Sequence, residues 1–133
     1  MSARDFDAWV AYLDARASRP LAWGSRANDC ISFAAGAVEA LTGRDLIAAA
    51  GFKWASAAGA ARVLKRVGGI AGALDLVLPR TECAMAHRGD VGLAVIEGRE
   101  SCVVIEGDLV VGPGVERLVR VPRAVLVQAW SVA

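Results

Sequence analysis

Apolar residues recur three and four positions apart in the first half of this 133-residue chain, and they form short uninterrupted runs in the second half. The first pattern is typical of helices that bury one face, and the second is typical of strands. The helical pattern predicts two early helices, one from Phe6 to about residue 17 and one over residues 31–41. Pro20 follows the first, and Gly43 suits the C-terminal cap of the second.

Residues typical of helix ends mark further boundaries. Ser2 followed by Asp5 resembles a capping box before the first helix. A short helix is expected over residues 45–50 and a longer one over residues 56–67, where Gly68 and Gly69 end it. A further helical turn or two is expected over residues 70–78, closed by Pro79.

The pattern changes after Gly89-Asp90, where short segments rich in Val, Leu and Ile alternate with turn residues. Strands are predicted over residues 91–96, 101–105, 109–111, 116–121 and 125–130. Because the turns between neighbouring strands are short, the pairs should be antiparallel. The expected fold is therefore α+β, with N-terminal helices packed on a small C-terminal antiparallel sheet in a single domain over residues 1–133.

Composition narrows the class of protein. The chain has 15 basic and 14 acidic residues and no long run of like charge, which argues against nucleic acid as a partner. Charged residues interrupt every long apolar stretch, so membrane insertion is not expected. Residues 1–7 lack the basic and then apolar pattern of a signal peptide. The expected location is the cytoplasm, or a larger assembly that leaves it.

Asn28-Asp29-Cys30 places a thiol at the first turn of the second predicted helix. Unpaired backbone N–H groups and the helix dipole favour a thiolate there, and Cys30 is therefore the candidate nucleophile. Asp29 would partly offset that effect through its own negative charge. His87 is the one histidine in the chain, and it lies before the first predicted strand. It is the candidate base, although a histidine in a surface loop is the commoner outcome at such a position.

The remaining cysteines do not form a recognisable framework. Cys30, Cys83 and Cys102 are odd in number and widely spaced, unlike the cysteines of secreted disulfide-bonded domains. Together with His87 they lack the paired Cys-x-x-Cys spacing of a zinc site. We therefore predict no metal site and no cofactor.

Several short motifs occur in an order that resembles a known family. They are Trp23-Gly24, Asp29-Cys30, Arg88-Gly89-Asp90, the strand from Ser101, and Ala129-Trp130. The layout resembles the NlpC family of papain-like cell-wall cysteine peptidases, in which Asp-Cys opens the central helix and carries the nucleophile. A closer likeness is to a branch found in phage and prophage genomes. The resemblance spans Phe6 to Trp130 and implies an NlpC-type fold.

The chain departs from that family where the catalytic histidine should stand. The strand after the Gly-Asp strand normally begins with His, but here Cys102, or Ser101, occupies that position. The third polar member of the triad would follow near Val111-Gly112, where no His, Asn or Gln is present. The resemblance thus implies incomplete catalytic machinery, with the thiols of Cys30 and Cys102 facing each other.

Three interpretations follow. The leading one is a catalytically degenerate NlpC-like domain that acts as a structural or binding component of a phage tail or tail tip, its partners being other tail proteins. It would be made in the host cytoplasm and then join the virion, where peptidoglycan is a further candidate partner. The second is an active peptidoglycan endopeptidase or amidase that uses Cys30, and the third is a Cys30–Cys102 redox pair. Trp23 is a candidate binding residue, and Trp54 and Trp130 are either groove residues or core.

Overall fold

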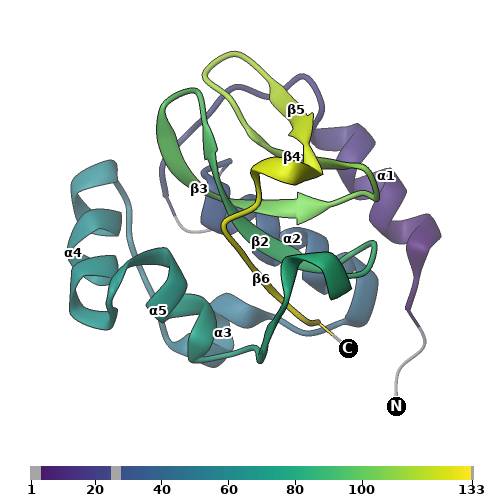
Figure 1. The fold of residues 1–133 in the computed structure, drawn as a ribbon. Helices are drawn as coiled ribbons and strands as arrows, with labels where there is room; N and C mark the ends of the chain where they lie inside the picture. Colours follow the sequence, from purple (N-terminus) through teal and green to yellow (C-terminus); the bar gives the residue numbers. More distant parts are fainter. Residues whose placement is uncertain (1–3, 25–27, 133) are drawn as a thin grey trace.

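The structure, a computed structural model, describes residues 4–24 and 28–132. Helices occupy the first part of the chain and strands the second (Figure 1). The helices are α1 (Phe6–Arg16), α2 (Cys30–Thr42), α3 (Leu46–Ala50), α4 (Ala57–Val67) and α5 (Gly69–Asp75). The strands are β1 (Arg80–Thr81), β2 (Val91–Ile96), β3 (Arg99–Ile105), β4 (Leu109–Pro113), β5 (Leu118–Pro122) and β6 (Gln128–Trp130). Short 3-10 helices cover Cys83–Met85 and Arg123–Val125.

The six strands form one antiparallel sheet in the order β1-β6-β2-β3-β4-β5. β2 and β3 are joined by the two-residue turn Glu97-Gly98, in which both residues have positive φ angles, 49° and 76°. Such turns match the twist of a hairpin and fix its register. The α+β prediction, with helices packed on a small antiparallel sheet, is confirmed.

Side chains one residue before α1, α2, α3 and α4 explain where these four helices begin, whereas α5 follows Gly68 and has no side-chain cap. Asp5, Asp29, Asp45 and Ser56 each accept a hydrogen bond from the backbone N–H three residues later. These bonds satisfy donors that have no partner inside the helix. The predicted contribution of Ser2 lies outside the described residues, and Asp5 caps α1 directly.

The sheet is buried on both faces. One core cluster joins α2 to the sheet and contains Phe33, Leu41, Cys102 and Val104. On the other face, Val103 and Ile105 pack with a smaller cluster partly covered by residues of β5 and the loop after it. Since side chains alternate along a strand, β3 contributes to both clusters and lies at the centre of the fold.

Several details of the predicted sheet are wrong. β3 begins at Arg99 and not at Ser101, and β4 extends to Pro113. β6 is limited to Gln128–Trp130, because residues 123–125 form a helical turn in which Leu126 N–H donates to the Arg123 carbonyl. β5 begins at Leu118 and not at residue 116, because a turn closes between Gly114 and Arg117. β1 was not predicted, and its two residues pair only with β6.

Within residues 4–24 and 28–132, none of the helices combines the length and apolar character that crossing a bilayer requires.

Candidate functional site

Cys30 is the first residue of α2, at the position where a helix N-terminus favours an anion. Its side chain is nevertheless almost fully buried, with 7% of its surface exposed. The structure therefore places the candidate nucleophile where the sequence predicted it, at a helix start, but within the core cluster.

Asp29, the residue before it, is a structural residue of this helix start. One carboxylate oxygen accepts a hydrogen bond from the Ser32 N–H at 2.8 Å. The other accepts from the Gly24 N–H at 3.1 Å and from the indole Nε1 of Trp54 at 2.9 Å. The carboxylate is fully buried, and three donors surround it. Asp29 thus ties the preceding loop, the start of α2 and the segment before α4 to one point.

Cys102 lies on β3, opposite Leu93 of β2, and is buried against α2. Burial raises the pKa of the Cys30 thiol to about 11; a backbone hydrogen bond from Cys102 opposes this rise, and the charge of Asp29 adds to it. Burial also raises the pKa of the Cys102 thiol, with further contributions from Cys30 and Asp29. The two thiols are close enough to affect each other's titration, and both remain free.

A small pocket of about 30 Å³ adjoins Cys30. It is lined by Leu21, Trp23, Cys30, Arg99, Glu100, Ser101 and Pro113. Trp23 is 37% exposed, so it forms an accessible part of this pocket, whereas Trp54 and Trp130 are buried core residues. The sequence analysis missed Arg99 and Glu100 because it began the strand at Ser101. The turn at Glu97-Gly98 was the signal that could have located them.

His87 lies far from this pocket. It is exposed and belongs to the turn before β2, where its backbone N–H donates to Asp90 Oδ2 at 2.7 Å. A Cβ placed on Gly89 in the same turn would lie 2.6 Å from Leu41 Cδ2, near the C-terminal end of α2. Leu41 follows Cys30 by eleven residues in that helix, which corresponds to about 16 Å. His87 and Cys30 therefore lie toward opposite ends of α2.

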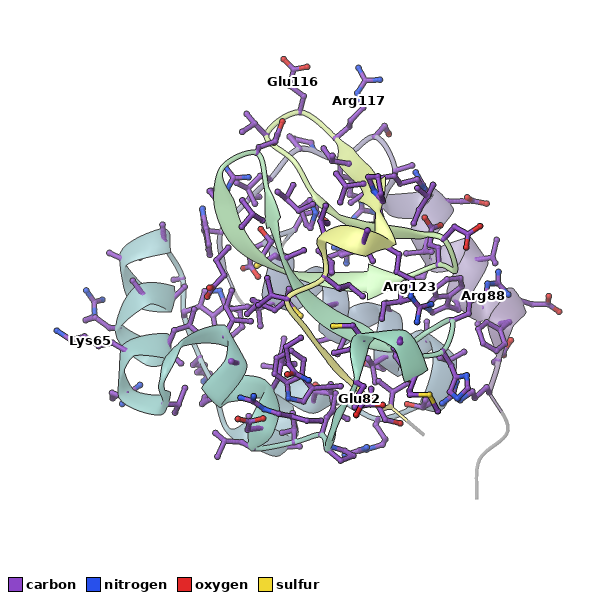
Figure 2. The ribbon with its side chains drawn as sticks, viewed as in Figure 1. Lys65, Glu82, Arg88, Glu116, Arg117 and Arg123 are labelled. Carbon is purple, nitrogen blue, oxygen red and sulfur yellow. The ribbon has the colours of Figure 1, made fainter. Side chains whose placement is uncertain are left out.

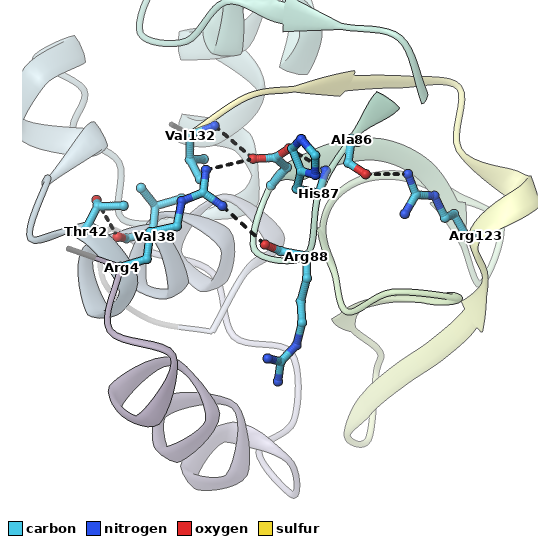
Figure 3. A network of polar contacts seen from close by, with 9 residues as sticks. Arg4, Val38, Thr42, Ala86, His87, Arg88, Arg123 and Val132 are labelled. Carbon is cyan, nitrogen blue, oxygen red and sulfur yellow. Dashed lines mark hydrogen bonds and ion pairs between the residues drawn. The ribbon is translucent and has the colours of Figure 1, made fainter. Parts of the chain in front are cut away.

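The Arg88-Gly89-Asp90 segment is a structural turn, and Figure 3 shows polar contacts of the labelled Arg88, His87 and Val132 in this region. The buried carboxylate of Asp90 accepts from the backbone N–H groups of His87 and Val132. The Arg88 guanidinium stacks over the rings of Phe6 and Trp9, 4.8 Å from each centroid. Through these contacts the turn packs the start of β2 against α1 and the C-terminal segment.

The four residues considered above as metal ligands do not form one centre. Over the ranges that the structure describes, no three His, Cys, Asp or Glu side chains converge in a way that could hold a metal ion. Cys83 lies near the Leu126 carbonyl, beside the loop after β5.

A family model described as a domain of unknown function, DUF6950, matches residues 4–132. The chain belongs to the DUF6950 family. No curated protein matches it. This DUF6950 domain is similar in structure to the crystal structure of the NlpC/p60 domain of the peptidoglycan hydrolase SagA, with a TM-score of 0.61. The match covers 96% of this chain and 98% of the SagA domain at 18% sequence identity. It establishes the NlpC-like fold for this DUF6950 domain.

Proposed function

We propose that this DUF6950 domain is a catalytically degenerate NlpC-like domain that acts by binding, as a structural component of a phage tail or tail tip. The main support for a loss of catalysis is the environment of Cys30. The helix start that holds a nucleophile in NlpC-type peptidases is retained, and the thiol is buried beside Cys102 with no imidazole near it. The fold is thus kept without the base that the reaction needs.

The protonation state of Cys30 supports the same proposal. With a pKa of about 11, the thiolate makes up about one part in ten thousand at pH 7. A nucleophilic cysteine is usually activated by a base within hydrogen-bond distance, and that base is held by a third group. Asp29 cannot serve as the base, since its carboxylate accepts bonds from three structural donors. His87 lies toward the other end of α2.

The tail assignment comes from the likeness of the sequence to phage- and prophage-encoded domains of this type. A protein that joins a tail needs surface for neighbouring tail proteins, and its tail location would bring it close to peptidoglycan. Trp23 is the candidate contact for a wall-derived ligand, because its exposed aromatic ring offers contact area at low entropic cost.

The second candidate function is an active cysteine hydrolase that cuts an amide bond of peptidoglycan. One observation favours it: Cys30 stands at a helix N-terminus next to a pocket that also contains Arg99 and Ser101. In such an enzyme the thiolate would attack the carbonyl carbon, and backbone N–H groups at the helix start would stabilise the oxyanion. The thiol proton would have to pass to a group other than His87, which would then protonate the departing amine, and water would hydrolyse the thioester.

Digestion of purified peptidoglycan separates the two functions. Wild type and Cys30→Ala should release the same fragments, no more than buffer does, as measured by liquid chromatography with mass spectrometry. A soluble fragment that appears with wild type and not with Cys30→Ala would overturn the degenerate assignment. For the tail role, peptide mass spectrometry of purified particles should find this chain among the tail proteins, and its absence from intact particles would refute that role.

A further inference from the structure

The chain has a marked asymmetry of charge. Four basic residues, Lys53, Arg62, Lys65 and Arg66, and no acidic residue lie within residues 46–74. The remainder of the chain then holds 11 of the 15 basic residues and all 14 acidic ones, a formal charge of −3. A near-neutral protein therefore carries a concentrated positive region on and beside α4, which we call the α4 basic face.

These cations lie on one open surface. Lys53 and the three cations of α4 line a hollow of about 690 Å³ between α4 and the segment before it. In Figure 1 α4 stands at the margin of the molecule beside α5, and in Figure 2 Lys65 points away from the body. Over residues 4–24 and 28–132, none of the four forms an ion pair.

The arrangement is unfavourable for an isolated helix. Arg62 and Arg66 are four residues apart and Arg62 and Lys65 three apart, so like charges face each other along one side. α4 contains no Glu or Asp that could pair with them. Lys65 and Arg66 in the last turn are favoured by the helix dipole, but Arg62 and Lys53 lie outside that turn. An anionic partner would relieve this repulsion.

The exposed part of α4 also has a shape suited to another helix. Its exposed positions form one stripe, Ala57, Ala58, Ala61, Arg62, Lys65 and Arg66. The three alanines leave room for close approach of a second backbone, and the long cationic side chains follow them along the same stripe. Alanine methyl groups add contact area with an apolar helix surface and add nothing to the binding of a phosphate polymer. From this combination we infer that an acidic amphipathic helix of a partner protein docks along the α4 basic face.

This inference rests on the binding role proposed above and names the chemistry of one partner surface. It is tested with the whole chain and a fluorescein-labelled peptide of about 20 residues that contains Ala and Leu with Glu along one helical face. The same peptide with Gln at every Glu position is the control. Wild type should bind the Glu peptide in an anisotropy titration and bind the Gln peptide at least about tenfold more weakly, and affinity should fall as salt is raised.

Variants locate the binding surface. Arg62→Glu/Arg66→Glu should weaken binding of the Glu peptide by at least about tenfold. The matched control Arg19→Glu/Arg117→Glu changes the charge equally away from α4 and should leave binding within about twofold of wild type. In Figure 2 Arg117 is well separated from Lys65. Arg62→Gln/Arg66→Gln removes the two charges without reversing them and should also weaken binding. Circular dichroism of this variant should show unchanged helicity, which separates loss of charge from loss of folding.

Three results would overturn the inference: no measurable binding of the Glu peptide to wild type, equal losses in the α4 and control variants, or tighter binding of a single-stranded DNA oligonucleotide of equal charge. Tighter binding of the DNA would show that the α4 basic face recognises phosphate polymers and not an acidic helix. The peptidoglycan digestion is independent of these titrations, so a hydrolytic product would refute the degenerate function without bearing on α4. Loss of peptide binding would refute the α4 docking surface alone.

Discussion

The indole Nε1 of Trp54 donates a hydrogen bond to Asp29 Oδ2 at 2.9 Å, so the residue before the candidate nucleophile is bound to a side chain 25 positions later. This bond connects the segment before α4 to the start of α2. The same carboxylate also accepts from the backbone on both sides of Cys30. The Asp-Cys pair of this fold therefore has a structural function that persists whether or not the cysteine reacts.

Removing the Asp29 carboxylate should destabilise the protein more than removing an ordinary helix cap. Asp29→Ala leaves three donors without an acceptor in a buried place, and we expect a loss of about 3 kcal/mol in the free energy of unfolding. Ser56→Ala is the matched control, since it removes one cap bond at an exposed helix start and should cost about 1 kcal/mol. Urea unfolding followed by circular dichroism measures both. Equal losses would show that the buried bonds to Gly24 and Trp54 contribute nothing.

Cys30 should be unreactive in the native protein. Alkylation requires the thiolate, and burial keeps the Cys30 thiol protonated with a pKa of about 11. With iodoacetamide at pH 8, half-buried Cys83 should be modified first, and Cys30 and Cys102 only after denaturation. Mass spectrometry of proteolytic peptides identifies each site. Rapid labelling of Cys30 below pH 8 would indicate an activated thiolate and would favour the hydrolase.

Local signals made much of the fold predictable. Residues 45–50 and 56–67 carried their own caps, and residues 91–96 formed an uninterrupted apolar run; the structure has helices and a strand there. The site was only partly predictable because its contacts come from distant segments. Nothing near Asp29 indicates that Trp54 binds it.

The start of the last strand was also unpredictable from local signals, because a distant contact determines it. The apolar pattern of residues 125–130 favours a strand throughout, but the Arg123 guanidinium donates to the carbonyls of Cys83 and Ala86, about 40 positions earlier. These bonds hold residues 123–125 in a helical turn. Regular pairing of the last strand with its neighbours therefore starts only at Gln128. Periodicity cannot reveal a contact between side chain and backbone across such a separation.

The buried thiol of Cys30 should make stability fall in alkali. The pKa of Cys30 is raised from 9.0 to about 11 on folding, so between these values the unfolded chain loses a proton that the folded chain retains. The stabilising contribution is complete below pH 9 and is lost as pH rises toward 11, at a slope approaching about 1.4 kcal/mol per pH unit.

The measurement is the free energy of urea unfolding between pH 8 and 10.5 under reducing conditions. Wild type should lose stability faster than Cys30→Ala over that range, because the variant lacks the titrating group. Parallel curves for the two proteins would contradict a raised pKa at this position. Cys102→Ala, which removes the neighbouring buried thiol, should also have a shallower slope than wild type.

An opposite pH dependence is expected at Asp75. Hydrogen bonds from Arg80 and from the Trp130 indole lower the pKa of the Asp75 carboxyl to about 2. Because the folded pKa lies below the value of an unfolded aspartate, about 3.9, the contribution to stability is complete above pH 4 and is lost as pH falls toward 2. Wild type should be more stable than Asp75→Asn at pH 6, and the difference should shrink on acidification. Repeating the comparison in an Arg80→Gln background should reduce the effect at pH 6, since the main partner is gone. A difference that stays constant from pH 6 to pH 2 would show that the carboxylate charge has no part in holding β1 and β6 to α5.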